Sequence, residues 1–593
     1  MPRTKFRSFR RSVSRGKRSR KPKEEPGSSA DVPSAKKIRL DESASPVTSK
    51  ESLSNKKLSG YRFQDVSILQ KALMACAVCN ECLKGNLQLF ERSSGCGLAR
   101  MFFLQCANNS CRALTELPTS EKSVHGKARF FDINRRSALA MRIIGRGRAS
   151  LTKFCSVMNM PGPVAKKSFT THVKAIARVS QQVTEAEMQK AVKEVRDINK
   201  AEEDEIADVA VSCDGTWARR GFKPLYGMVS AISVQTGKVV DIEMKSKVCY
   251  KCRAKSNLDV NSQEYIDWIA AHGPKCTRTF DKSSKAMEAQ GAVDMWNRSV
   301  EKNSLRYVDF VGDGDCSSHR DVVKAKPYGD EVIVRKVECV GHIQKRMGGR
   351  LRRKKKDMKG RNSDGKTIGG RNCLTDNLID IFQRYYGKAL WQNKGNLPNM
   401  QKAVKAIWHH YASTAENQMH ECCPEGNDSW CKWQKDQTNG TSSFKPKNVA
   451  PAVMQEILPT FEALWDENLL QSVLEGLSQN NNEALNHLVW DICPKEKFAG
   501  PETVETACSL AVCMFNGGAK TLQSVLKGLH LETGEHCRSG FTTIDQQRLY
   551  AAGQKALDAT KVCRQILRSQ RKSRNEQNEE QEGPTYEPGA FGL

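Results

Sequence analysis

The alternation of apolar and polar positions predicts a sheet in the middle of the chain. Runs rich in β-branched and apolar residues predict strands over 207–212, 226–234, 239–244, 305–311 and 332–337. Thr236-Gly237 separates the second run from the third, which is typical of a hairpin turn. A short helical stretch separates the last two runs. Hairpin-linked strands followed by strands that alternate with helices predict an α/β fold.

Helical spacing precedes this sheet, over about 135 to 200. Leu151 and Phe154 belong to a first set of apolar residues at helical spacing. Pro161 follows, and a second amphipathic run covers 169–179. Helix, proline-containing turn and helix fit a helix-turn-helix for a DNA end, and a plain packed helical hairpin fits the pattern equally well.

The net charge of the chain says more about its binding partner than its length does. The chain has 593 residues, too many for one core, and its 95 Lys and Arg against 66 Asp and Glu give a net charge of +29. This excess predicts a polyanionic partner, nucleic acid first. A membrane surface is the other polyanion, but no apolar run is long enough to span a bilayer and no export signal is visible. We therefore expect a soluble protein that is not secreted and does not bind a membrane.

Three basic clusters are candidate binding sites for this polyanion. Clusters at 17–21 and 36–39 lie in a tail poor in aromatic residues and match signals read by the nuclear import machinery, although solvated charge runs look alike. A third run predicts phosphate contacts or, again, a solvated face, through Arg350, Arg352, Arg353, Lys354, Lys355 and Lys356. The tail clusters favour the nucleus.

Cysteine spacing predicts zinc rather than disulfides, because the chain is long and lacks an export signal. The clearest set is a pair of close pairs, Cys249, Cys252, His272 and Cys276. A second set has zinc-ribbon spacing, Cys79, Cys82, Cys106 and Cys111, with Cys76 and Cys96 as competing members. A third site is possible around His420, Cys423 and Cys431, with His409 or His410 upstream as fourth ligand.

Carboxylates follow two of the predicted strands. Asp214 ends the first run, and Asp313 comes directly after the run 305–311, each beside glycine. A rigid sheet holds such carboxylates with their oxygens exposed, as a hard cation requires, although an Asp before Gly is often only a turn residue. Asp315 competes for the second position, and we prefer Asp313 because it comes first after the strand.

A third carboxylate lies on a predicted helix over 480–490. Asn481 or Asn482 is a candidate cap. One face of this helix then carries Glu483, Asn486, His487 and Trp490. A glutamate near a helix start often only offsets the dipole. Three carboxylates together hold two Mg²⁺ or Mn²⁺ ions for phosphodiester chemistry.

In this order the segments 212–217, 312–315 and 481–486 resemble the first, second and third acidic motifs of the Mutator-like transposase domain. The resemblance spans roughly 60 to 550. It implies a ribonuclease-H-like catalytic core with a DDE triad, Asp214, Asp313 and Glu483, and a helical insertion before the last acid. Such domains also carry a Cys-x-x-His after the following strand, which Cys339 and His342 match, either beside the metals or as packing residues.

The implied organisation is a basic tail (1–60), a zinc-ribbon-like segment (61–120), a helical segment (121–205), a first core part with a zinc insert (206–345, insert 245–280), a helical insertion (346–475), a second core part (476–550) and a C-terminal helix and tail (551–593). The expected function is DNA transposition, cutting and joining double-stranded transposon ends and target by hydrolysis and transesterification, by a homo-oligomer in the nucleus. The alternatives are a domesticated, non-catalytic nuclear DNA-binding protein and a nuclease acting on RNA or hybrids.

Overall fold

The computed structural model describes residues 34, 37, 38, 60–91, 95–125, 128–202, 204–218, 225–314, 317–358, 368, 370, 372–445, 449–495 and 499–557. The chain forms two compact units, Lys37–Asp545 and Met1–Lys36 with Gln546–Leu593. The described part of the second unit includes the end of helix α19 (Glu535–Ala556). The basic cluster 17–21 lies outside the described residues.

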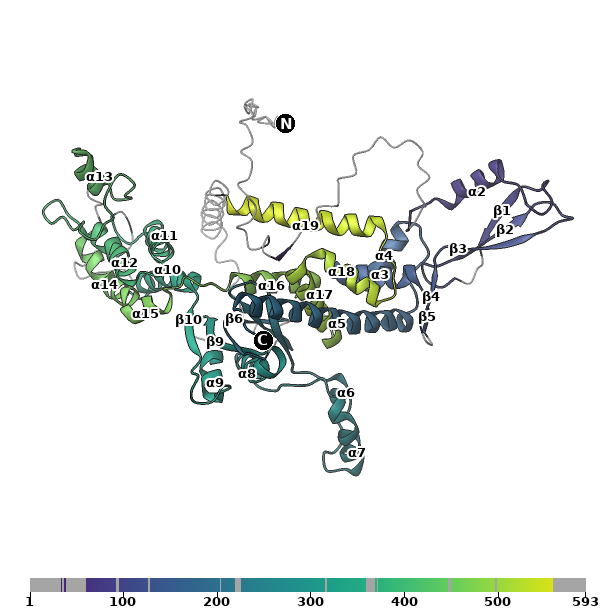
Figure 1. The fold of residues 1–593 in the computed structure, drawn as a ribbon, viewed down its shortest axis with the longest axis horizontal. Coiled ribbons are helices and arrows are strands. Elements are labelled where there is room, and N and C mark those ends of the chain that lie inside the picture. Colours follow the sequence, from purple (N-terminus) through teal and green to yellow (C-terminus); the bar gives the residue numbers. More distant parts are fainter. Residues whose placement is uncertain are drawn as a thin grey trace, which may run out of the picture. The chain divides into compact units, whose positions relative to one another are not determined.

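A mixed five-stranded sheet forms the centre of the first unit (Figure 1). Its strands are β6 (Ala207–Trp217), β7 (Tyr226–Ser233), β8 (Val239–Ser246), β9 (Leu305–Gly312) and β10 (Arg335–Glu338), in the order β10-β9-β6-β7-β8. Strands β6, β7 and β8 pair antiparallel, whereas β9 is parallel to both β6 and β10. The α/β prediction is confirmed, and each predicted strand is present.

Strand β6 is longer than the apolar run predicts, so Asp214 lies inside the strand and not at its end. Asp214, Gly215 and Thr216 continue the ladder against β7, where Asp214 is opposite Ser230. The backbone hydrogen bonds of this pairing outweigh the low strand propensity of Asp and Gly.

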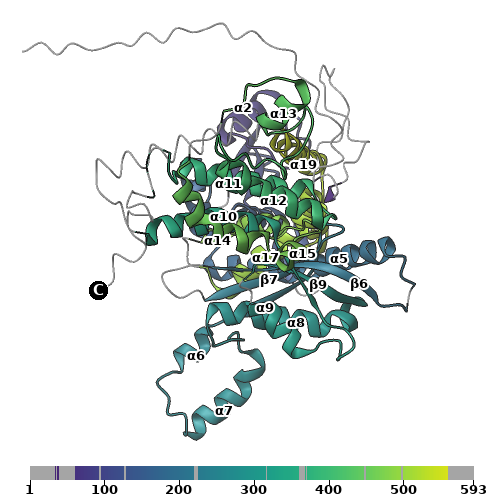
Figure 2. The same cartoon turned by 90° about the vertical axis from the view of Figure 1, so that its left-hand side faces the viewer.

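Helices cover both faces of the sheet (Figure 2). Val229 and Ala231 of β7 belong to the same core as Trp296 of α8 (Ser284–Asn303). Met228 and Ile232 point the other way, into a core with helices α5 (Lys166–Ile198), α16 (Asn480–Ile492) and α17 (Pro501–Gly517). Every residue of β7 is buried, as expected for a central strand covered on both faces.

The N-terminal part contains a three-stranded antiparallel sheet, β1 (Leu87–Glu91), β2 (Met101–Cys106) and β3 (Leu114–Pro118), preceded by α2 (Val66–Cys76). A hairpin of β4 (Lys122–His125) and β5 (Ala128–Phe131) leads into α3 (Asp132–Ile143), α4 (Arg148–Val157) and α5. The helical prediction for this segment is confirmed. Phe154 lies on the helix α4, as its spacing predicts, and is 45% exposed.

A second helical region lies between β10 and α16 in the sequence. It comprises α10 (Val340–Asp357), α11 (Asp376–Gln392), α12 (Leu397–Ala412), α13 (Lys432–Asn439), α14 (Pro451–Trp465) and α15 (Glu467–Ser472). It has its own core, in which Phe382, Tyr386 and Phe461 are fully buried. We refer to it as the helical insertion.

Shorter elements complete the described chain. Helices α6 (Tyr250–Ala254) and α7 (Gln263–His272) and the 3₁₀ turn η2 (Gly273–Lys275) lie between β8 and α8, and α9 (Ser317–Ala325) lies between β9 and β10. The 3₁₀ turn η3 (Ala519–Thr521) and α18 (Leu522–Gly528) precede α19. Within the described residues, every helix is too short or too polar to cross a membrane.

Candidate active site

Parallel pairing of β6 with β9 brings Asp214 and Asp313 to neighbouring positions. Ser212 of β6 is opposite Val311 of β9, and each acid comes two residues after its strand's member of this pair. Residues two apart on a strand point to the same face. Asp214, within β6, and Asp313, directly after β9, therefore lie near each other on neighbouring strands. The rival Asp315 lies outside the described residues.

The Cys-x-x-His segment starts helix α10 beside Asp313. The Nδ1 atom of His342 is 3.8 Å from Oδ1 of Asp313. Cys339 is buried, its N–H donates to the carbonyl of Gly312, and its sulfur accepts from the N–H of Gln479. Cys339 thus ties β9, α10 and the start of α16 together, and His342 is the member that faces the acids.

Helix α16 lies along β6 through a ladder of side-chain hydrogen bonds. Gln479 donates to the carbonyl of Cys213 (2.8 Å), and the Asn482 amide donates to the carbonyl of Ser212 (3.2 Å). One turn later Asn486 donates to Oδ2 of Asp214 (2.8 Å). The helix cap was wrongly predicted: the cap residue is Gln479, without a side-chain cap bond, because the side chain of Asn482 is buried against the sheet.

Glu483 lies on the exposed side of α16, three residues before Asn486. It lines a hollow of about 470 Å³ together with Asn486, His487, Thr216 and Trp490. Thr216 accepts a hydrogen bond from the indole N–H of Trp490 (2.7 Å). The predicted polar face of the helix, Glu483, Asn486, His487 and Trp490, therefore meets one concave surface beside Asp214.

Asp214 is half-buried, and its charge has an acidic neighbour. Burial, and next the negative charge of Glu288, raise the pKa of Asp214 to about 7, while the Gly215 backbone and Asn486 favour the charged form. A Cβ at Gly215 would lie only 2.9 Å from Oε2 of Glu288, so α8 places this carboxylate directly against the strand. Sequence reasoning missed Glu288, since only the packing of α8 on the sheet brings it here.

The three predicted acids do not by themselves form a closed ligand set. Among the described residues, the groups of three or more Cys, His, Asp or Glu whose ligand atoms all lie within 4.8 Å of one another are three Cys/His clusters. The carboxylates come from β6, the end of β9 and α16. Their oxygen donors, half-buried or exposed, suit Mg²⁺ or Mn²⁺, which prefer oxygen ligands.

The first Cys/His cluster brings together the four residues of the strongest zinc prediction. The sulfurs of Cys249 and Cys252 are 3.3 and 3.2 Å from Nε2 of His272, and Cys252 is 3.5 Å from Cys276, sulfur to sulfur. Zn–S bonds of about 2.3 Å and Zn–N bonds of about 2.0 Å in a tetrahedron give ligand separations of roughly 3.5 to 3.8 Å. The indole of Trp268 stacks on His272 and helps to fix the ring. These four residues can hold zinc.

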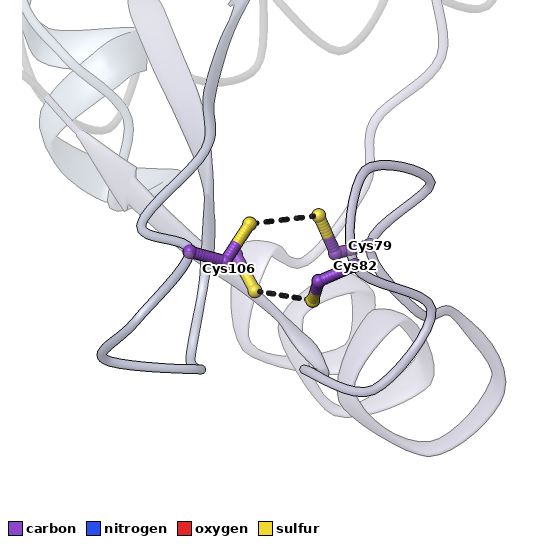
Figure 3. A group of neighbouring side chains, drawn as sticks. Cys79, Cys82 and Cys106 are labelled. Carbon is purple, nitrogen blue, oxygen red and sulfur yellow. Dashed lines mark hydrogen bonds between the residues drawn. The ribbon is translucent and has the colours of Figure 1, made fainter.

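The second cluster selects one set from the competing N-terminal cysteines. Cys79 and Cys82 follow α2 and face Cys106 from the end of β2 (Figure 3). The sulfur of Cys79 is 3.8 Å from that of Cys111, and Cys82 is 3.6 Å from Cys106. The competitors Cys76 and Cys96 are exposed and do not belong to the group.

The cysteines of this second cluster differ in pKa, and burial raises the pKa of Cys106 to about 12. The backbone N–H groups of Lys84 and Gly85 lower the pKa of Cys82 to about 6, which favours the thiolate that binds zinc.

The third cluster lies in the helical insertion and resolves the choice of its fourth ligand. His410, His420, Cys423 and Cys431 are all buried and mutually within 4.8 Å. The sulfur of Cys423 is 3.8 Å from Nδ1 of both histidines. His409 instead stacks on Trp465 and is not part of the group. The four ligands are of the types that form closed structural zinc sites.

The basic run lies on α10 and is partly neutralised by the insertion. Arg352 pairs with Asp380, Lys354 with Glu456 and Lys355 with Asp376. Arg350, Arg353 and Lys356 are exposed, and Arg353 lies 3.9 Å from Asp357 of the same helix. Half of the predicted phosphate contacts are thus engaged in packing the insertion.

Comparison of the sequence with known protein families gives a match to a transposase family. The Mutator-like transposase family matches residues 60–431, more than half of the chain. The matched range contains Asp214, Asp313 and all three Cys/His clusters and ends before Glu483. A search of curated proteins gives no match. The chain belongs to the Mutator-like transposase family.

Proposed function

We propose that this protein is a DDE-type DNA transposase that cuts and joins transposon-end DNA, with Asp214, Asp313 and Glu483 as its catalytic acids. The observation that supports the proposal is the parallel register of β6 and β9, because the paired residues Ser212 and Val311 each lie two positions before one of the acids. Membership in a transposase family adds the substrate class, DNA. The hydrogen bond from Asn486 to Asp214 adds further support, because it holds α16, the helix that carries Glu483, against β6.

A ribonuclease-H-like core is the fold that we propose for this site. The support is the strand order, an antiparallel β6-β7-β8 meander extended on the β6 side by the parallel strands β9 and β10. The helical insertion between β10 and α16 then separates the last acid from the other two. We also propose the domain limits expected from the sequence, with the ribbon-like segment and helices α3–α5 as the part that binds DNA ends.

The carboxylates would hold two Mg²⁺ or Mn²⁺ ions, which supply charge stabilisation and an activated nucleophile for phosphodiester cleavage. Asn486 orients Asp214, and His342 contacts Asp313 from the other side. In the first step water attacks phosphorus and the 3′ oxygen leaves. In the second the freed 3′-hydroxyl attacks a target phosphodiester and displaces its bridging oxygen. No residue becomes covalently attached to DNA.

Zinc, partners and cell compartment complete the proposal. The three Cys/His clusters would bind zinc with four protein ligands each, which leaves no open position for catalysis, so their role is structural. We propose action as a homo-oligomer in the nucleus, with the basic tail as the import signal. The net charge of +29 fits a DNA partner.

Nicking of supercoiled plasmid by the purified full chain with Mn²⁺ tests the proposal. We expect wild-type protein to nick and Glu483→Gln to nick at least about a thousandfold more slowly. Asp330→Asn is the matched control, because its carboxylate is exposed and only pairs with Lys326. Nicking by Glu483→Gln at the wild-type rate would remove Glu483 from the site. Tight DNA binding without nicking by wild type would favour the non-catalytic alternative.

A further inference from the structure

The hollow beside Glu483 has a composition that metal binding alone does not explain. Besides Glu483 and Asn486 it is lined by His487, Trp490, Asp491 and Lys495. Its volume of about 470 Å³ falls in the range of small-ligand sites. An aromatic wall and a cation next to the proposed catalytic acid suggest a part of the substrate that is both flat and linked to phosphate.

Trp490 is the aromatic residue that lines this hollow. The ring packs against the buried core around α16 and α17, and its N–H is fixed to Thr216. The ammonium of Lys495 lies 5.0 Å from the ring centroid, and both side chains line the hollow. The Lys495 ammonium therefore covers one face of the ring, and a base can stack on that face only when Lys495 turns away from it toward a phosphate.

The charged side chains in the hollow favour different positions for a phosphate and for a base. Away from the proposed metal ions, Glu483 and Asp491 repel a phosphate, so a second phosphate is favoured near Lys495. A neutral, flat base stacks on an indole and tolerates the acids. The basic turn after α3 lies close by, since a Cβ at Gly145 would be 2.9 Å from the carbonyl oxygen of Asp491. DNA bound along that turn can deliver a nucleotide here.

We propose that this hollow receives an unpaired DNA base next to the scissile phosphate, stacked on Trp490, with Lys495 pairing to the adjacent phosphate. The base must be unpaired, because both faces of a base in a duplex are covered by its neighbours. The location beside the scissile phosphate rests on the proposed function of Glu483. The Trp490 hollow thus favours DNA ends that are open or distorted at the cleavage point.

Binding of forked and fully paired DNA of one sequence tests this site. The probe carries 2-aminopurine at the unpaired position, and Ca²⁺ replaces Mn²⁺ to prevent cleavage. Base stacking on an aromatic residue corresponds to a roughly five- to hundredfold effect on binding. We expect wild type to bind the fork at least about fivefold more tightly than the duplex and to quench the 2-aminopurine. Trp490→Leu should lose both the preference and the quenching.

Three further variants keep the test decisive. Trp490→Phe keeps a ring and should keep most of the preference, which separates stacking from a folding defect. Lys495→Ala should weaken binding of both DNAs and leave the preference. Trp391→Leu is the matched control, because Trp391 is 42% exposed with Lys394 at 4.2 Å from its ring, but belongs to the helical insertion.

The outcomes separate this inference from the proposed function. Equal binding of fork and duplex by wild type, or an unchanged preference in a folded Trp490→Leu, overturns the base site even if wild type nicks plasmid. Loss of the preference in Trp391→Leu as well overturns it too, since the effect is then general. A fork preference that depends on Trp490, in a protein that does not nick, supports the base site and removes the catalytic proposal.

Discussion

The Cys/His clusters and the carboxylate site are assembled over different stretches of the sequence. Each cluster draws its ligands from one short segment, 79–111, 249–276 or 410–431, and the structure brings the ligand atoms within 4.8 Å of one another. Asp214, Asp313 and Glu483 come from three distant elements and form no such group. Local spacing is enough to complete a metal site, whereas the acids depend on sheet register and on the docking of α16.

The largest expected effect comes from the most buried of the three acids. Asp214→Asn should lower the plasmid nicking rate at least about a thousandfold, because the variant cannot supply a charged oxygen to a cation. The melting temperature should stay level or rise, because burial and Glu288 disfavour the charge that the substitution removes. Nicking rates and thermal unfolding of the same preparation check both parts. A variant that is active, or inactive only because it is unfolded, would contradict the assignment.

The clusters should respond to substitution in stability and not in chemistry. Cys249→Ser combined with Cys252→Ser should remove one zinc equivalent of three, since two ligands cannot hold the ion. Hydrogen exchange should then lose protection over 249–276 while the central sheet keeps it. Metal analysis by mass spectrometry with peptide-level exchange measures this. Zinc content unchanged in the double variant would show that these residues do not bind the metal.

The third cluster offers a matched pair of neighbouring histidines. His410→Ala should lose one zinc equivalent and lower the melting temperature by several degrees, because a closed site in the insertion loses a ligand. His409→Ala should retain all zinc, since His409 stacks on Trp465 outside the group. The reverse result would exchange the two assignments.

The contrast also explains what the sequence could predict. The strands around Asp214 and the ligands Cys249, Cys252, His272 and Cys276 follow from local periodicity and spacing, and the structure contains them. The choice of His410 over His409 does not follow, because adjacent residues differ only in which side of α12 they occupy. Glu288 could not be found either, since the close approach of α8 to Gly215 depends on long-range packing.

The Asn482 cap prediction failed for the same long-range reason. The sheet offers this amide the carbonyl of Ser212 and the hydroxyl of Ser230, which are better partners than its own helix. Local capping rules take no account of hydrogen bonds to a strand that is distant in the sequence.

Of two asparagines on α16, we expect one to contribute mainly to stability and the other mainly to activity. Asn482 is fully buried and bonds to Ser212 and Ser230, so Asn482→Ala should lower the free energy of unfolding by about 2 kcal/mol as buried polar groups lose their partner. Asn486 contacts only one oxygen of Asp214 at the rim of the hollow, so Asn486→Ala should cost less than about 1 kcal/mol. Its nicking rate should nevertheless fall about tenfold, because Asp214 loses the group that orients it. Denaturant unfolding and nicking rates of both variants test this division.

The smallest expected effect concerns His172, a buried histidine that belongs neither to a Cys/His cluster nor to the carboxylate site. Burial, and next the charge of Arg135, lower the pKa of His172 to about 4, whereas an unfolded histidine titrates near pH 6.5. The unfolded chain therefore binds the proton more readily, and His172 makes the protein less stable as the pH falls from about 6.5 toward 4. His172→Leu should remove this dependence, so the stability of wild type relative to the variant should decline between pH 7.5 and pH 5. Replacement of the exposed His487 by Gln controls for general acid effects, including protonation of zinc ligands, which both proteins share. A stability difference that stays constant with pH would mean that His172 titrates alike in the folded and unfolded chains, and would contradict this prediction.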